Sequence, residues 1–127
     1  MTDYVLDASA LLAAFFGEEG ADRVEDMLPH AVIGAVNLSE VVAKLQDRGV
    51  PDREIDRHVA DLDLEIIAFD RLQAIGAGRL RRETISTGLS LGDRCWLALA
   101  AQRGAVAVTA DRAWSSLGLS IAVEVIR

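Results

Sequence analysis

The stretch VLDASALLA, residues 5–13, sets a carboxylate between two apolar segments. Residues 4–6 have the side chains of a short buried strand, and an unbroken apolar run follows over residues 10–16. Asp7 stands where these two segments meet, and an ionised carboxylate is costly to bury there without partners. The sequence leaves two interpretations open: Asp7 caps a helix, or it belongs to a site that needs its charge.

The chain around this stretch has 127 residues, of which 51% are hydrophobic, and a net charge of −7. This length predicts one domain over residues 1–127 with a core of its own. The acidity argues against broad contact with a phosphate backbone, but not against a nuclease that gathers its acids around a metal. No apolar run is long enough to span a membrane, no secretion signal is recognisable, and the single cysteine, Cys95, cannot form an internal disulfide, so we expect a cytoplasmic protein.

Short apolar runs alternate with longer segments of helical periodicity along the whole chain. The expected strands are Tyr4–Leu6, Ala31–Val36, Leu64–Phe69, Ala105–Thr109 and Ile121–Val125. The expected helices are Ser9–Phe16, Gly20–Leu28, Leu38–Arg48, Asp52–Leu62, Arg71–Thr84 and Asp93–Arg103. This alternation predicts an α/β fold with a mainly parallel sheet of four to five strands and helices on both faces.

Three further acids stand near expected helix starts, as Asp7 does. Glu40 lies in AVIGAVNLSEVVAKL, Asp93 in LSLGDRCWLALA and Asp111 in AVAVTADRAW. Residues just past the ends of parallel strands gather along one edge of a sheet, where ligands bind. Asp7, Glu40 and Asp111 belong to that edge by sequence, and Asp93 opens a helix that could reach it.

Each acid taken singly has a simpler explanation as part of a helix cap. The pairs Asn37 with Glu40 and Ser90 with Asp93 have the spacing of a capping box. Four carboxylates at one edge would, however, repel one another by about 1–4 kcal/mol for each close pair. With no His or Cys beside them, such a cluster favours a hard cation, Mg²⁺ or Mn²⁺.

These four motifs resemble, in order and spacing, the acidic motifs of PIN-domain ribonucleases, and most closely those of the VapC-type toxins of bacterial toxin–antitoxin pairs. The resemblance extends over essentially the whole chain. It implies a PIN-like domain that binds one or two Mg²⁺ or Mn²⁺ ions and hydrolyses RNA phosphodiester bonds by metal-activated water. It also implies a cognate antitoxin as partner, an RNA substrate and a homodimer.

The resemblance carries the catalytic and metal-binding roles to Asp7, Glu40, Asp93 and Asp111. Polar residues that flank these motifs are expected to support the acids or contact phosphate, and they are Ser9, Asn37 and Thr109. Arginines near the motifs are candidate RNA contacts, although a solvated helix face explains them equally well: Arg79, Arg81, Arg82, Arg94 and Arg112.

The first expected helix is apolar nearly all round, which is typical of a helix covered on every side. Either it lies deep in the core, or an antitoxin segment packs on Leu11, Leu12, Phe15 and Phe16. The sequence favours neither.

Other protein classes fit less well. A receiver-like signalling domain would need paired acids after the first strand and a late lysine, but Ala8 follows Asp7 and the single lysine is Lys44. A haloacid-dehalogenase phosphatase would need an acid where Ser9 stands. A catalytically silent interaction module with the PIN fold remains an alternative.

Overall fold

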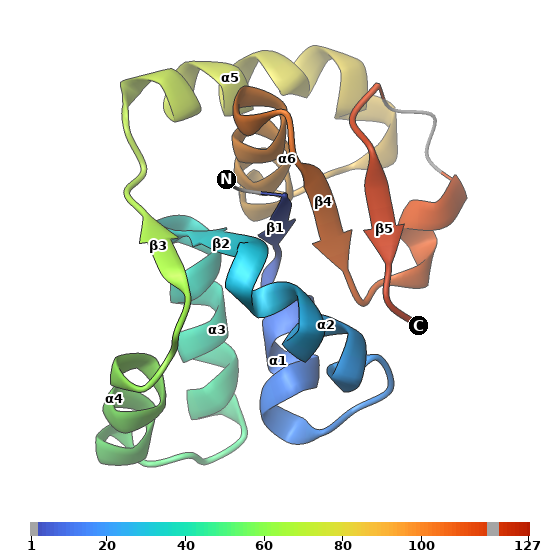
Figure 1. The fold of residues 1–127 in the computed structure, drawn as a ribbon. Helices are drawn as coiled ribbons and strands as arrows, with labels where there is room; N and C mark the ends of the chain where they lie inside the picture. Colours follow the sequence, from blue (N-terminus) through green and yellow to red (C-terminus); the bar gives the residue numbers. More distant parts are fainter. Residues whose placement is uncertain (1–2, 117–119) are drawn as a thin grey trace.

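A computed structural model of the chain describes residues 3–116 and 120–127. The described residues form one parallel sheet with strand order β3-β2-β1-β4-β5, so the first strand lies at its centre (Figure 1). The strands are β1 (Tyr4–Leu6), β2 (Ala31–Gly34), β3 (Glu65–Ile67), β4 (Val106–Thr109) and β5 (Val123–Val125). Every strand pair is parallel, which confirms the predicted fold class.

The α-helices are α1 (Ala8–Phe16), α2 (Ala21–Met27), α3 (Ala35–Asp47), α4 (Asp52–Ala60), α5 (Arg71–Thr84) and α6 (Leu91–Arg103). Alternate strand residues face opposite layers, as the period of a strand requires. Leu6, Ile33 and Val108 pack with α1, α2 and α3 on one face, whereas neighbouring strand residues pack on α6 on the other. Helix α5 covers α6 from outside, across the top of the view in Figure 1.

Two expected boundaries shift in a way that matters for the site. Strand β2 ends at Gly34 rather than at Val36, and α3 begins at Ala35 with Gly34 as its N-cap. Asn37 and Glu40 therefore lie inside the first two turns of α3, and the capping box expected from their spacing is wrong. The pairing of β2 with β3 ends at Gly34, and the chain turns directly into α3 there.

The second capping box is confirmed at the start of α6. The Ser90 hydroxyl accepts a hydrogen bond from the Asp93 backbone N–H, and the Asp93 carboxylate accepts one from the Ser90 N–H. The helix therefore begins at Leu91, two residues before the expected start. At its other end Gly104 adopts a φ of 59°, a left-handed conformation that favours glycine and stops the helix.

No helix in the described part of the chain is long and apolar enough to cross a membrane.

Candidate active site

The candidate site lies at the carboxyl ends of β1 and β4. From β1 the chain continues to β2 and β3 on one side, whereas β4 and β5 lie on the other side of β1. The strand order therefore reverses between β1 and β4. Open parallel sheets bind their ligands in the crevice at such a reversal. Asp7 follows β1 directly, and Thr109 ends the neighbouring β4.

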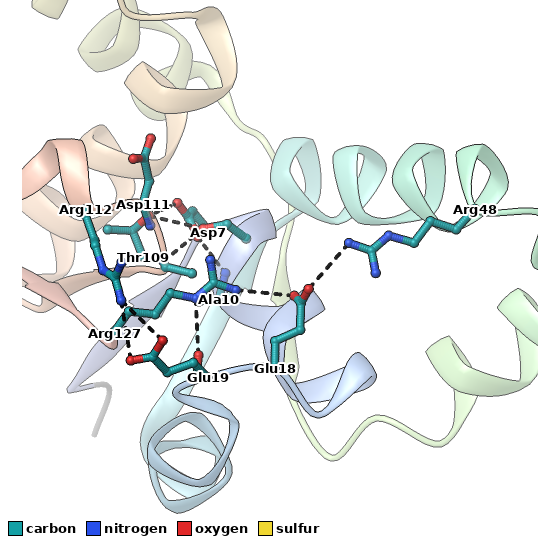
Figure 2. Close-up of polar contacts among 11 residues, drawn as sticks. Asp7, Ala10, Glu18, Glu19, Arg48, Thr109, Asp111, Arg112 and Arg127 are labelled. Atoms are coloured by element: carbon teal, nitrogen blue, oxygen red, sulfur yellow. Dashed lines mark hydrogen bonds and ion pairs between the residues drawn. The ribbon is translucent and has the colours of Figure 1, made fainter.

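The Asp7 carboxylate is held by donors from both sides of this crevice. One oxygen, Oδ1, accepts hydrogen bonds from the Ala10 backbone N–H at 2.9 Å and from the Ser9 hydroxyl at 2.7 Å. The other, Oδ2, accepts one from the Thr109 hydroxyl at 2.5 Å. Asp7 is thus the N-cap of α1, and it also faces the groups that follow β4 (Figure 2).

Ser9 and Thr109 also order the loop after β4. The Ser9 hydroxyl accepts a hydrogen bond from the Ala110 backbone N–H at 2.9 Å, and Thr109 Oγ1 accepts one from the Asp111 N–H at 3.1 Å. Both hydroxyls were expected to flank the acidic motifs. Their observed partners place them between Asp7 and the segment that carries Asp111.

Glu40 is positioned by α3 and α6 together. The Asn37 side-chain amide donates to Glu40 Oε1 at 2.8 Å and to the Gly92 carbonyl at 3.2 Å. The Glu40 carboxylate lies so close to Gly92 that a Cβ built there would be 2.5 Å from Glu40 Oε2. A glycine next to Asp93 therefore lets the carboxylate of α3 reach the start of α6.

The four predicted acids line one small pocket, of about 220 Å³. The full lining is Asp7, Ala8, Ser9, Leu12, Asn37, Glu40, Lys44, Asp93, Asp111 and Trp114. Asp7 is buried, Glu40 and Asp93 are half-buried and Asp111 is exposed, so the acids run from the floor of the pocket to its rim. This pocket brings together acids up to 104 positions apart, counted from Asp7 to Asp111.

Burial dominates the electrostatics of Asp7. Loss of hydration, with a smaller contribution from the nearby charge of Asp93, raises the pKa of its carboxyl from 3.8 to about 6. The hydrogen bonds from Thr109, Ala10 and Ser9 act in the opposite direction, because they stabilise the ionised form. The effect of desolvation on the pKa is larger than that of the three hydrogen bonds. A positive charge near Asp7 would therefore stabilise its ionised form.

The donor set fits a hard cation, since every candidate ligand is an oxygen and no His or Cys lines the pocket. Asn37 faces Glu40 with its amide nitrogen, and its buried Oδ1, which has no hydrogen-bond partner, lies beside Gly34, where a built Cβ would be 3.6 Å away. Within residues 3–116 and 120–127, however, no three His, Cys, Asp or Glu side chains are arranged so that they could hold a metal ion. The acids surround a shared space without converging on one point, which suits an ion that keeps several of its waters.

The candidate arginines are divided among three environments. Arg79, Arg81 and Arg82 are exposed on α5, and none of them lines the acidic pocket. Arg94 is half-buried between helices, where it donates a hydrogen bond to the Ala77 carbonyl at 3.0 Å. Arg112 is exposed beside Asp111 and pairs with Glu19 at 3.2 Å.

The apolar side chains of α1 also separate into two groups. Leu11 has no exposed surface and belongs to the core, so its expected role in an antitoxin groove is wrong. Leu12 is 8% exposed and lines the acidic pocket. Phe15 is half-buried and packs on His58, whereas Phe16 is 37% exposed beneath the Arg48 guanidinium.

Sequence reasoning did not assign Lys44 or Trp114 to the pocket, and it did not identify Gly92 as the residue that contacts Glu40. Lys44 follows Glu40 by four positions, and that spacing places both side chains on one face of a helix. Gly92 contacts Glu40 only through tertiary packing, which no local pattern signals. Trp114 is buried against Trp96, with ring centroids 5.0 Å apart, while its own side chain lines the pocket.

Comparison with known proteins agrees with this architecture. A family model described as the PIN domain matches residues 4–118. A DNA-bound VapBC from Salmonella typhimurium superposes with a TM-score of 0.78 and 22% identity, covering 100% of both chains. A toxin–antitoxin complex from Klebsiella pneumoniae superposes with a TM-score of 0.75 and 20% identity, covering 98% of each chain. VapBC-5 from Mycobacterium tuberculosis superposes with a TM-score of 0.64 and 23% identity, covering 100% of this chain and 99% of that one. No curated protein matches the sequence.

Proposed function

The chain belongs to the PIN-domain family, and from this premise we propose that it is a divalent-metal-dependent endoribonuclease, the toxin of a toxin–antitoxin pair. One observation carries the proposal: Asp7, Glu40, Asp93 and Asp111 line a single pocket at the point where the strand order reverses. Helix capping does not account for all four acids: Asp7, Asp93 and Asp111 each accept a backbone hydrogen bond at a helix start, but Glu40 lies inside α3 and still lines the same pocket.

Mg²⁺ or Mn²⁺, when bound, supplies a water of lowered pKa and positive charge against the phosphate in the transition state. Asp7 and Asp93 are the proposed direct ligands. Glu40 and Asp111 would hold the ion directly or through water, and they would orient the attacking water as a general base does. Ser9 and Thr109 fix the Asp7 carboxylate by hydrogen bonds, and Asn37 fixes that of Glu40.

Position within the pocket gives each acid a different accessibility to RNA. Asp7 lies on the floor behind its three donors and is suited to holding an ion rather than touching substrate. Asp111 is exposed at the rim, on the segment that also carries Arg112. An RNA phosphate entering from the rim would meet this segment first.

The strand order excludes the receiver-like alternative. Receiver domains have the order 2-1-3-4-5, whereas this sheet has 3-2-1-4-5. The silent interaction module shares the PIN fold, so it is distinguished by activity and not by topology.

The experiment is cleavage of a fluorescently labelled single-stranded RNA by the purified chain. We expect cleavage with Mg²⁺ or Mn²⁺, none in EDTA, and a loss of at least ~100-fold in Asp93→Asn, the size of loss that follows removal of one electrostatic contact to a transition state. Asp70→Asn is the control, because Asp70 also accepts a backbone hydrogen bond at a helix start, as the N-cap of α5, but does not line the pocket. Full activity in chelator would refute the metal site, and no cleavage with either ion would favour the silent module.

The antitoxin partner is proposed because the solved structures with this fold include complexes described as VapBC and toxin–antitoxin assemblies. Phe16 is the exposed apolar anchor of α1, with Phe15 and Leu12 beside it. The antitoxin would cover these side chains and direct a basic residue toward the acids. A homodimer remains a prediction, and sedimentation of the antitoxin-free chain would test it.

A further inference from the structure

A second and larger cavity, of about 550 Å³, adjoins the acidic pocket. The two cavities share four lining residues, namely Ser9, Leu12, Lys44 and Asp111. A chain molecule bound at the acids could therefore continue directly into the second cavity. We call it the basic groove.

The basic groove collects positive charge in a protein whose net charge is −7. Its cationic lining residues are Lys44, Arg48, Arg112 and Arg127, and its anionic ones are Glu18 and Asp111. These side chains come from four separate segments of the chain: α3 with the residue that follows it, the loop between α1 and α2, the segment after β4, and the residues after β5. Figure 2 shows the three arginines directed toward the α1–α2 loop.

Two carboxylates of that loop hold the arginines in the observed structure. Glu18 pairs with Arg48 at 3.6 Å and with Arg127 at 3.4 Å. Glu19 pairs with Arg112 at 3.2 Å, and its carbonyl accepts a hydrogen bond from Arg127 Nε at 3.3 Å. One short acidic loop thus occupies three arginine side chains at once (Figure 2).

These ion pairs are loose. A well-formed pair of a guanidinium with a carboxylate has a distance of about 2.7–2.9 Å, which Arg23 and Glu124 reach at 2.7 Å on the surface of the same protein. The pairs in the groove are longer and their side chains are partly exposed, with exposed fractions from 30% to 68%. Long, solvent-exposed pairs contribute little to stability, so another anion can replace the carboxylates readily.

The guanidinium groups of the basic groove favour phosphate as the anion that replaces the carboxylates. Guanidinium groups bind phosphate oxygens through the same paired N–H donors that they use for carboxylates. A phosphodiester backbone presents a negative charge at every nucleotide, so a strand could fill the groove while one of its linkages lies at the acids. The segment that carries Arg127 is anchored beside β4, since Ile126 is buried and donates a hydrogen bond to the Thr109 carbonyl.

We propose that Lys44, Arg48, Arg112 and Arg127 bind the phosphates of single-stranded RNA next to the linkage that is cleaved, and that Glu18 and Glu19 occupy these arginines until RNA displaces them. The inference rests on the proposed function for its substrate class. It adds a binding site and a competing acidic loop, and it includes Arg112, which the sequence had already suggested.

The test is binding of labelled single-stranded RNA to the full chain in EDTA, where the proposed reaction is blocked, at salt concentrations of about 50 to 200 mM. Replacing both Arg48 and Arg127 by Gln should weaken binding by about tenfold at the low-salt end. It should also reduce the slope of log K against log salt by about 1.4, since each phosphate contact to a single strand contributes about 0.7. Arg112→Gln tests the same idea at the third arginine, which pairs with Glu19 rather than with Glu18.

Glu18→Gln gives the opposite and more specific result. Removing this carboxylate frees Arg48 and Arg127 from their competitor, so RNA affinity should rise by about threefold. Arg53→Gln and Glu54→Gln are the matched controls, because both residues are exposed on α4 and line neither cavity. A thermal melt of each variant identifies any that fails to fold.

Unchanged affinity and salt slope in the arginine variants, or weaker binding in Glu18→Gln, would overturn the inference. Weakened binding of a purified antitoxin with unchanged RNA affinity would also overturn it, and would assign the groove to the protein partner. Failure of the proposed function looks different: the wild-type chain would not cleave RNA with Mg²⁺ or Mn²⁺, although the arginine variants still reduced RNA binding.

Discussion

Asp7→Asn separates the two roles of Asp7, because asparagine can cap a helix but carries no charge. The side-chain oxygen of the introduced amide can accept the hydrogen bonds from Ala10 and Ser9 that Asp7 Oδ1 accepts now. Asn and Asp are about equal as N-caps, so the cap itself should survive. What the substitution removes is a buried charge and the acceptor for the Thr109 hydroxyl.

The raised pKa of Asp7 gives both the sign and the size of the effect. Between pH 3.8 and about 6 the folded protein binds a proton that the unfolded chain releases, so the free energy of unfolding falls as the pH rises through this window. Above it, the ionised carboxylate costs about 3 kcal/mol, at 1.36 kcal/mol for each pKa unit. Below pH 3.8 the carboxyl is protonated in both states and this cost is absent.

The lost acceptor for Thr109 offsets part of the gain. The Thr109 hydroxyl already accepts a hydrogen bond from the Asp111 N–H, so it would have to turn to accept another from the new amide. We assign about 1 kcal/mol to this change. The net expectation is a gain of about 2 kcal/mol above pH 6, or about 8 °C in melting temperature for a chain of this size.

The assay is thermal unfolding in EDTA at pH 4 and pH 7.5, repeated at the higher pH with Mg²⁺. The wild-type chain should gain stability with Mg²⁺, whereas Asp7→Asn should be more stable without metal and should lose that gain. Asp70→Asn is the control, since Asp70 accepts a hydrogen bond from the Gln73 N–H at 2.9 Å, the distance found between Asp7 and Ala10. If Asp7→Asn melts lower at both pH values and still responds to Mg²⁺, Asp7 is a cap and not a metal ligand.

Three further predictions concern packing and the partner surface. Gly92→Ala should reduce the rate of RNA cleavage even though the variant still folds and melts close to the wild type, because the alanine Cβ would collide with the Glu40 carboxylate. Leu11→Ala should lower the free energy of unfolding by about 2–5 kcal/mol in denaturant titrations, as for other fully buried leucines. Phe16→Ala should melt nearly as the wild type does but weaken antitoxin binding by about thirtyfold, measured by calorimetry; unchanged binding would place the partner surface elsewhere.

The fold followed from local patterns because those patterns report burial. Strand β1 is apolar at every position and helices cover both faces of the sheet, so a continuous apolar run was the correct indicator of a central parallel strand. Ser90 and Asp93 predicted a helix start through a contact between residues three apart, and such contacts depend little on the rest of the fold.

Local patterns gave wrong predictions of capping and burial where the side chains make tertiary contacts instead of local ones. Asn37 and Glu40 have capping-box spacing, yet their side chains meet each other and Gly92 instead of the start of α3. Leu11 and Phe16 read alike in an apolar run, but one lies in the core and the other is exposed. Whether a side chain of a helix is buried depends on which face of the helix packs against the sheet. A sequence that is apolar at every position does not indicate which face that is.

By itself, the sequence determined the parallel α/β fold and the four acids, since both depend on residue types at positions that strand and helix geometry fix. Only the tertiary structure decided which groups surround the acids. Pairing of β1 with β4 brought Thr109 to Asp7, packing of α3 on α6 brought Glu40 to Gly92, and the return of the chain after β5 brought Arg127 to Glu18. The physical reason is that charges and hydrogen bonds act over a few ångströms in space, whereas Asp7 and Thr109 are 102 positions apart along the chain.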